Sequence, residues 1–253
     1  MALIQCQFFS EAIGMMTSAT VILPERRPEG HAHPTLYLLH GLSDDHSAWV
    51  RRTSIERYVE QLGLAVVMPQ VHRSFYTDMA TGYNYWTFLS EELPRVMHAM
   101  FPLSDRREDR FVAGLSMGGY GAFKWALSRP EQFAAAASLS GALHMANRDV
   151  DFTARQIEKD IQLIYGGIEH VAGSENDLLW LIEQRMQDSK PLPAFYQCCG
   201  TEDFLYNENL VFRDACQAAG IPLTYVEGPG SHDWTYWDAR IRDVLDWLPL
   251  RKS

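Results

Sequence analysis

The sequence predicts an α/β fold in which a mostly parallel sheet is covered by helices on both faces. Short apolar runs recur along the chain, each followed by a turn signal. Strands that are buried on both faces are nearly continuous in this way and do not alternate. Segments with helical spacing lie between the runs, and an alternation of strands and helices is typical of a parallel sheet.

The first 25 residues predict an antiparallel pair of strands at one edge of the sheet. Two apolar segments, at 4–9 and 17–23, are separated by the short stretch "SEAIGMM" at 10–16. Antiparallel strands can be joined by a short connection of this kind, whereas parallel strands need a crossover.

Six later runs are expected to form the buried strands. They are "TLYLLHG" at 35–41, "LAVVMP" at 64–69, "RFVAGL" at 110–115, "FAAAASLSG" at 133–141, "AFYQCCG" at 194–200 and "LTYVEG" at 223–228. Helical spacing between them is found at 53–63, 85–101 and 119–130. A helical excursion is expected at about 142–190, since this connection is longer than an ordinary crossover. It either covers part of a site or lies at the periphery. The length fits one domain over residues 1–253.

Composition limits the classes of partner. The chain carries 22 basic and 32 acidic side chains, a net charge of −10. Nucleic acids and anionic membranes are bound through clustered Lys and Arg, so neither partner is expected.

No signal peptide and no apolar run of about 18 residues is found, so the expected location is the cytoplasm. The four cysteines are expected to be reduced core thiols, with a redox role for the pair at 198–199 as the alternative. Homo-oligomerisation stays open.

The stretch "AGLSMGGYG" at 113–121 contains the pattern G-x-S-x-G, formed by Gly114, Ser116 and Gly118. It lies where a buried strand ends and a helix is expected to begin. A sharp turn of this kind strains the serine backbone, exposes its hydroxyl, and leaves no room for side chains at the glycine positions. This context favours Ser116 as a nucleophile over a chance match to the pattern.

A nucleophilic serine requires a histidine base and a carboxylate, which follow it in the order Ser, Asp, His in this kind of sheet. Asp203 follows the run at 194–200, and His232 follows the run at 223–228, so both are expected in turns beyond strand ends. Asp233 and Glu202 are competing carboxylates. Asp233 adjoins the histidine and is more typical of a local structural role.

The other histidines are expected to be structural or solvated. His144 and His170 are not preceded by the expected strand and acidic turn. The pair "HAH" could suggest a metal site, but a strand separates the candidates and no other spacing supports zinc. These candidates are His31, His33, His40 and His46. No metal is therefore expected.

Two backbone N–H groups are expected to stabilise a developing oxyanion. Met117 follows the serine at the start of a helix, and Leu42 lies in the loop "HGLSDDHSAW" after the first long strand. Gly41 allows a sharp turn there. His40 is expected to shape this loop and to take no direct part in chemistry.

Several blocks of the sequence resemble the esterase D group of α/β-hydrolases. They include "LYLLHGLSDDHSAWVRRTSIERY", "FVAGLSMGGYGAFKWAL" and "GSHDWTYWD", and the likeness extends from about residue 6 to 248. Within the group the chain is most similar to small bacterial carboxylesterases of the tributyrin-esterase type. The resemblance implies an α/β-hydrolase fold, hydrolysis of short acyl esters and no cofactor. It implies the same five residues as above, with Ser116, Asp203 and His232 as the triad and Leu42 and Met117 as oxyanion donors.

The sequence and the resemblance together predict a serine carboxylesterase that acts on a small-molecule ester through an acyl-enzyme. Four aromatic residues on the expected site loops, Trp49, Trp86, Phe204 and Trp234, could wall a substrate pocket, although each could instead be a core residue. One alternative is an S-formylglutathione hydrolase, a thioesterase of the same superfamily. A non-catalytic binding module is disfavoured, since it would be expected to lack a triad member.

Overall fold

A computed structural model describes residues 1–25, 32–146, 155–187 and 190–251 of the protein. In this part of the chain no helix is both long enough and apolar enough to cross a membrane. The expected helical excursion at about 142–190 therefore lies partly outside the described residues, because positions 147–154 and 188–189 are not included.

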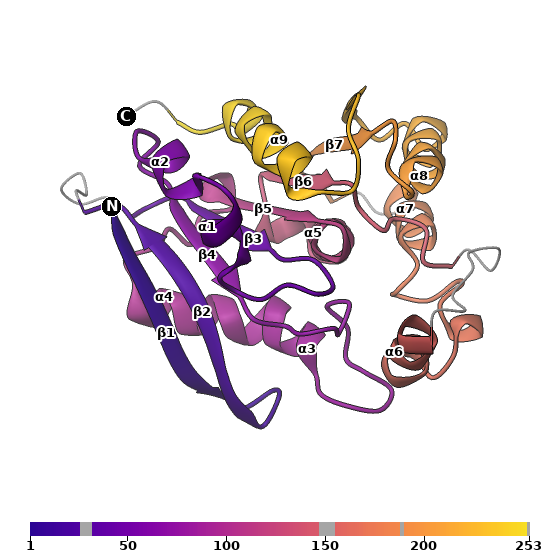
Figure 1. Ribbon diagram of the computed structural model, residues 1–253, viewed down its shortest axis with the longest axis horizontal. Coiled ribbons are helices and arrows are strands. Elements are labelled where there is room, and N and C mark those ends of the chain that lie inside the picture. The colour runs from indigo at the N-terminus through magenta and orange to yellow at the C-terminus, as the bar shows by residue number, and fades with distance from the viewer. Residues whose placement is uncertain (26–31, 147–154, 188–189, 252–253) are drawn as a thin grey trace.

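The strands form one eight-stranded sheet in the order β1-β2-β4-β3-β5-β6-β7-β8 (Figure 1). Strand β1 pairs antiparallel with β2, and β2 antiparallel with β4, whereas the pairs from β4 to β8 are all parallel. The α/β class and its antiparallel N-terminal edge are thus confirmed. The strands are β1 (Ala2–Ser10), β2 (Met15–Leu23), β3 (Thr35–Leu39), β4 (Ala65–Pro69), β5 (Arg110–Leu115), β6 (Ala135–Leu139), β7 (Ala194–Gly200) and β8 (Leu223–Gly228).

Helices connect the strands and cover both faces of the sheet. They are α1 (Ala48–Arg52), α2 (Ile55–Val59), α3 (Tyr85–Thr87), α4 (Leu93–Met100), α5 (Met117–Ser128), α6 (Arg155–Tyr165), α7 (Leu178–Met186), α8 (Tyr206–Ala218) and α9 (Trp234–Trp247). A π-helical segment, Phe88–Glu92, joins α3 to α4, so the expected helix at 85–101 is continuous but changes its winding. The expected helix at 53–63 is shorter, because only Ile55–Val59 is helical there.

Two hydrophobic cores lie on opposite faces of the sheet. Residues of α1, α2 and α9, among them Trp49, Ile55 and Val244, pack on one face. Residues of α3 to α8, such as Leu93, pack on the other. The central strands are buried on both faces, which is why their sequences are continuously apolar.

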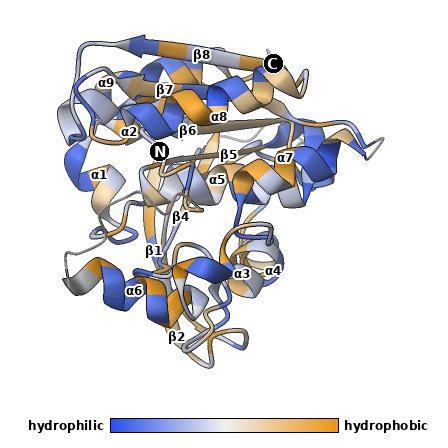
Figure 2. Cartoon of the chain, turned by 90° about the vertical axis from the view of Figure 1, so that its right-hand side faces the viewer, coloured by the Kyte–Doolittle hydropathy of each residue, from blue (hydrophilic) through white to orange (hydrophobic). Residues whose placement is uncertain are grey.

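The helices α6 and α7 of the excursion pack on the α5 side of the sheet. Figure 2 shows hydrophobic and hydrophilic residues alternating along α6, as expected for a helix with one buried face. Ile164 of α6 and Leu181 of α7 belong to the same core as α5. Asn176, just before α7, receives hydrogen bonds from α5: its carbonyl accepts from the Tyr120 hydroxyl at 2.9 Å, and its Oδ1 accepts from Lys124 Nζ at 2.7 Å.

Candidate active site

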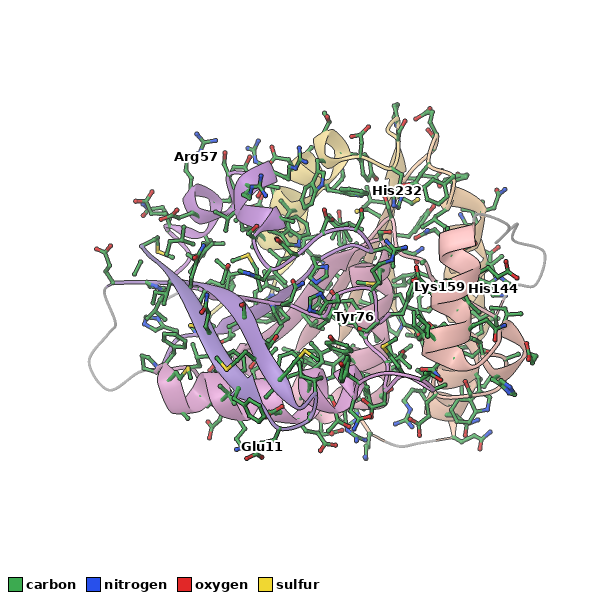
Figure 3. The ribbon with its side chains drawn as sticks, turned by 60° about the horizontal axis from the view of Figure 1, so that its bottom comes forward. Glu11, Arg57, Tyr76, His144, Lys159 and His232 are labelled. Carbon is green, nitrogen blue, oxygen red and sulfur yellow. The ribbon has the colours of Figure 1, made fainter. Side chains whose placement is uncertain are left out.

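Three side chains from turns beyond the carboxyl ends of β5, β7 and β8 form one hydrogen-bonded row. Ser116 Oγ lies 3.0 Å from His232 Nε2. His232 Nδ1 lies 3.0 Å from Asp203 Oδ1 and 2.9 Å from Asp203 Oδ2. Because the strands are parallel, their carboxyl ends meet at one edge of the sheet, and residues far apart in the sequence come together there. Figure 3 shows where His232 lies at this edge.

Ser116 occupies the turn between β5 and α5. Its φ of 52° and ψ of −118° are unusual for a residue other than glycine. The residues around it at 111–115 and 117–127 are buried, and Ser116 is the one residue among 111–127 that is partly exposed. The fold therefore presents one hydroxyl from an otherwise buried segment.

The flanking glycines make this turn possible by leaving space for the backbone. A Cβ at Gly114 would lie 2.3 Å from the carbonyl oxygen of Gly118. A Cβ at Gly118 would lie 2.5 Å from the carbonyl oxygen of Leu39 on β3. Both neighbours are backbone atoms, which cannot rotate away, so the helix could not approach the sheet this closely with side chains at either position.

Asp203 is held as a carboxylate beneath the histidine. Its side chain is fully buried, and Oδ1 also accepts a hydrogen bond from Leu205 N–H at 2.8 Å. Burial alone would raise the pKa of Asp203, but the hydrogen bonds from His232 and Leu205 outweigh it and keep the pKa below its usual value. An ionised carboxylate can only accept, so His232 carries its proton on Nδ1 and turns the Nε2 lone pair toward the Ser116 hydroxyl.

The two competing carboxylates have local partners. Asp233 Oδ1 accepts from the backbone N–H groups of Thr235 and Tyr236 at 2.9 and 3.1 Å, which makes Asp233 the N-cap of α9. Glu202 is exposed, and its carboxylate accepts from the Gly230 N–H and the Thr201 hydroxyl. Neither carboxylate takes part in the row.

The loop after β3 is shaped by His40, as its sequence context predicts. The ring is buried, with Nδ1 2.7 Å from the Gly41 carbonyl oxygen and Nε2 3.2 Å from Val71 N. Nδ1 therefore donates to the carbonyl, and Nε2 accepts from the N–H of Val71. Burial lowers the pKa of His40 to about 4, so the ring is neutral at physiological pH.

The hydrogen bond from His40 Nδ1 to the Gly41 carbonyl also orients the peptide group between Gly41 and Leu42. The C=O of Gly41 and the N–H of Leu42 belong to one trans peptide and point in opposite directions. Because the carbonyl is held toward His40, the Leu42 N–H points away from that ring. The N–H groups of Leu42 and Met117 have no hydrogen-bond partner among the described residues, so both are available as donors.

Other features of the described residues do not compete with this site. No group of three or more His, Cys, Asp or Glu that could hold a metal ion is found there. His46, one of the histidines considered for a metal, bonds instead to Thr20 Oγ1 at 2.7 Å, and His31 lies outside the described residues. A surface hollow on α1 and α2 is lined by residues such as Val50 and Arg57 and contains none of the row. It offers no nucleophile paired with a base.

The comparisons with known proteins agree with this geometry. A family model described as "Putative esterase" matches residues 10–248. The chain belongs to the esterase family. An acetyl esterase from Caldicellulosiruptor saccharolyticus is 30% identical over 261 residues, covering 98% of each chain. Two structures from Staphylococcus aureus are each 38% identical to this chain. They are the fluorophosphonate-binding serine hydrolase FphF, with a TM-score of 0.89 and 99% of both chains covered, and the S-formylglutathione hydrolase FrmB, with 0.88 and 98%.

This esterase is a carboxylic ester hydrolase of the serine type. Its fold agrees with that of the similar serine hydrolases, which are α/β-hydrolases in which a mostly parallel sheet carries helices on both faces.

The aromatic residues expected around a pocket have different positions in this esterase. Phe204 is 76% exposed, and its ring centroid lies 4.5 Å from that of His232. Trp234 is partly buried and packs edge-on against Trp49 and Trp237 at 5.2 and 5.3 Å. Phe204 is therefore adjacent to the row, and Trp234 is one ring further away.

For Trp49 the structure supports the core role, the alternative that the sequence left open to a place in the pocket wall. It is 1% exposed, and its Nε1–H donates to the Leu39 carbonyl at 3.0 Å. A side chain with almost no accessible surface cannot wall a substrate pocket. Trp86 is partly buried at the start of α3, where its ring lies 4.9 Å from Lys124 Nζ, and it has no ring contact with His232.

Two residues near the site were missed from the sequence. Trp237 is buried and lies edge-on to His232, at 4.9 Å between ring centroids. Tyr76, in the interior of the molecule (Figure 3), donates its hydroxyl proton to the His40 carbonyl at 2.8 Å. Its ring packs so closely on Gly121 that a Cβ there would lie 2.4 Å from it. The glycine in "GGYGAF" indicates a close neighbour on this helix face, but only the tertiary structure identifies that neighbour.

Proposed function

We propose that Ser116 is the nucleophile of this esterase, His232 its general base and Asp203 the carboxylate that orients the base. The single observation that carries the proposal is the hydrogen-bonded row from Ser116 Oγ through His232 to Asp203. Ser116 Oγ attacks the ester carbonyl carbon while His232 Nε2 takes its proton, and Asp203 stabilises the imidazolium that forms. The imidazolium then protonates the departing alcohol, which leaves an acyl-enzyme.

Deacylation uses the same groups in reverse. His232 removes a proton from water, the hydroxide attacks the acyl carbonyl, and the proton returns to Ser116 Oγ as the carboxylic acid leaves. The N–H groups of Met117 and Leu42 act as the two oxyanion donors in both halves of the reaction. Each donor is worth about 3 kcal/mol of transition-state stabilisation in comparable sites. Neither N–H has a hydrogen-bond partner within the part of the chain that the structure describes, which supports this role.

The substrates are proposed to be short-chain acyl esters of small molecules, and the protein to be an esterase D-type enzyme that works in the cytoplasm as a single domain. The 30% identity with an acetyl esterase over nearly the whole chain supports the acyl preference. Phe204 and Trp234 are the proposed substrate-facing aromatics, since Phe204 contacts the His232 ring and Trp234 packs next to it through Trp237.

One observation favours a second candidate, hydrolysis of the thioester S-formylglutathione. FrmB, a solved S-formylglutathione hydrolase, is as similar to this chain as FphF is, at 38% identity. The same triad would act on either carbonyl. A side-by-side panel of acetyl to butyryl esters and S-formylglutathione separates the two, because the physiological class should have the higher kcat/KM.

The assignment of the nucleophile is tested with Ser116→Ala and a fluorophosphonate probe. We expect Ser116→Ala to lose nearly all esterase activity and all labelling, while its thermal unfolding stays that of a folded protein, since the change empties no core volume. Ser231→Ala is the matched control, because Ser231 is an exposed serine next to His232. It should keep labelling at Ser116. Labelling at another residue, or wild-type turnover in Ser116→Ala, would reject the assignment.

A further inference from the structure

The strand β1 is an edge with unusual properties. It lies at the outer end of the sheet and, among the described residues, pairs only with β2 (Figure 1). Its other side therefore presents a row of backbone N–H and C=O groups along nine residues, Ala2–Ser10. Such edges are usually protected by charged residues, proline, bulges or short length. β1 contains no charged residue, no proline and no glycine.

The opposite edge of the sheet is protected in the usual way. β8 is six residues long, ends at Gly228 and carries the charged Glu227. The contrast between the edges indicates that β1 is suited to pairing with another strand, because a long uncharged edge left bare invites aggregation.

The side chains of β1 are complementary to themselves. Leu3, Gln5, Gln7 and Phe9 alternate on one face and are exposed, while Cys6 on the other face is half-buried against the core. Residues at equal distances on either side of Cys6 are alike: Gln5 matches Gln7, and Leu3 matches Phe9. If two copies of β1 run antiparallel with their Cys6 residues opposite each other, amide meets amide and apolar meets apolar, and no charges meet.

We propose that β1 is a homodimer interface, in which two copies of this chain pair edge to edge about a two-fold axis at Cys6 and join their sheets. Backbone hydrogen bonds between the two β1 strands provide the pairing, and side-chain pairs on the exposed face set the register. A second copy is the partner because the sequence of β1 complements itself in this register. The interface is independent of the proposed catalytic roles.

The exposed apolar side chains support this register. Leu3, Phe9 and Met16 are 47%, 59% and 63% exposed, and Phe9 lies opposite Met16 in the β1–β2 pair. In the proposed dimer Leu3 of the second copy lies opposite Phe9, so Met16, Phe9 and that leucine form one apolar row across three strands. The two-fold axis generates the same row a second time.

The register is tested by cross-linking at Cys6. Directly opposite residues in an antiparallel pair have Cα atoms about 4.5–5.5 Å apart, which is within reach of a short bis-maleimide. The other three cysteines, Cys198, Cys199 and Cys216, are buried. We expect the wild-type protein to give a covalent dimer at mildly alkaline pH, because burial raises the pKa of the Cys6 thiol. Cys6→Ser should give none.

Charge substitutions at Gln5 and Gln7 provide matched variants. In the proposed register residue 5 of one copy faces residue 7 of the other, so Q5K/Q7K places like charges opposite each other twice. Q5E/Q7K places opposite charges there. We expect light scattering on a sizing column to give the mass of two chains for wild type and Q5E/Q7K, and of one chain for Q5K/Q7K. Esterase activity should be unchanged in all three proteins, since both glutamines are exposed and lie outside the row formed by Ser116, His232 and Asp203.

Three results would overturn the proposal. One is a wild-type protein that is monomeric at the highest concentration it tolerates. A second is a Q5K/Q7K variant that keeps the wild-type mass, and a third is a dimer without cross-linking at Cys6. Because Q5K/Q7K lowers the net negative charge of the chain, its dissociation cannot be ascribed to general repulsion between acidic proteins. Loss of activity in Ser116→Ala has no bearing on these masses, so the two proposals fail separately.

Discussion

Replacing Asp203 with asparagine should reverse the proton arrangement of His232. In the wild type, Oδ1 accepts from the Leu205 N–H at 2.8 Å, and Oδ2 lies 2.9 Å from His232 Nδ1. Only an oxygen can accept from Leu205, so the amide oxygen of the variant should occupy the Oδ1 position and the NH2 group the Oδ2 position. That NH2 donates to Nδ1 and moves the histidine proton to Nε2. The nitrogen that faces Ser116 then has no lone pair to accept its proton.

The loss follows from this wrong tautomer. Where the same exchange has been made in a Ser-His-Asp triad, kcat falls roughly 10,000-fold, equivalent to about 5 kcal/mol of transition-state stabilisation. We expect a loss of this size for Asp203→Asn, with KM little changed, because the substrate contacts are untouched. The assay is steady-state hydrolysis of p-nitrophenyl acetate, with the rate of fluorophosphonate labelling as a second measure of nucleophile activation.

Asp233→Asn is the control for this experiment. Asp233 directly follows His232 in the sequence, and asparagine caps a helix about as well as aspartate, so α9 should keep its N-cap and activity should stay near the wild-type value. If Asp203→Asn kept activity within tenfold of wild type, the role of Asp203 in setting the tautomer would be refuted. A large loss of activity in Asp233→Asn would instead indicate that Asp233 orients His232.

Three further predictions concern substrate, metal and pH. Acetyl to butyryl p-nitrophenyl esters should have a higher kcat/KM than esters of eight or more carbons. A short pocket cannot bury a long acyl chain and so forgoes the roughly 0.8 kcal/mol of transition-state binding that each further buried methylene could add. A maximum of kcat/KM at eight carbons or beyond would contradict this prediction. Overnight treatment with a strong chelator should leave activity intact, whereas a loss that zinc restores would contradict a metal-free mechanism. Burial lowers the pKa of His40 from 6.5 to about 4, so the unfolded chain binds this proton more readily than the folded one. The free energy of unfolding should therefore rise as the pH is raised from the folded to the unfolded pKa of His40, by up to about 3 kcal/mol. Denaturant titrations at several pH values should show this rise in the wild type, and His40→Gln should lack it.

Local patterns in the sequence were sufficient for the fold class and for the residues of the row. Continuous apolar runs mark strands buried on both faces, and G-x-S-x-G marks a turn that only glycines at 114 and 118 allow. The parallel arrangement brings the carboxyl ends of the strands to one edge, so residues that follow different strands could be expected to meet. Ser116, Asp203 and His232 were identified in this way because each lies in the turn that follows a strand.

The tertiary structure alone decided which aromatic rings lie near that edge. Trp49 and Phe204 both follow strands in the sequence, yet one is 1% exposed and the other 76%. The difference depends on what packs above each ring: Trp49 lies against Trp234 of α9, a contact between residues 185 positions apart, whereas Phe204 faces solvent beside His232. Periodicity indicates which face of an element is apolar. It contains no information on which distant element covers that face, because burial is a property of the assembled packing.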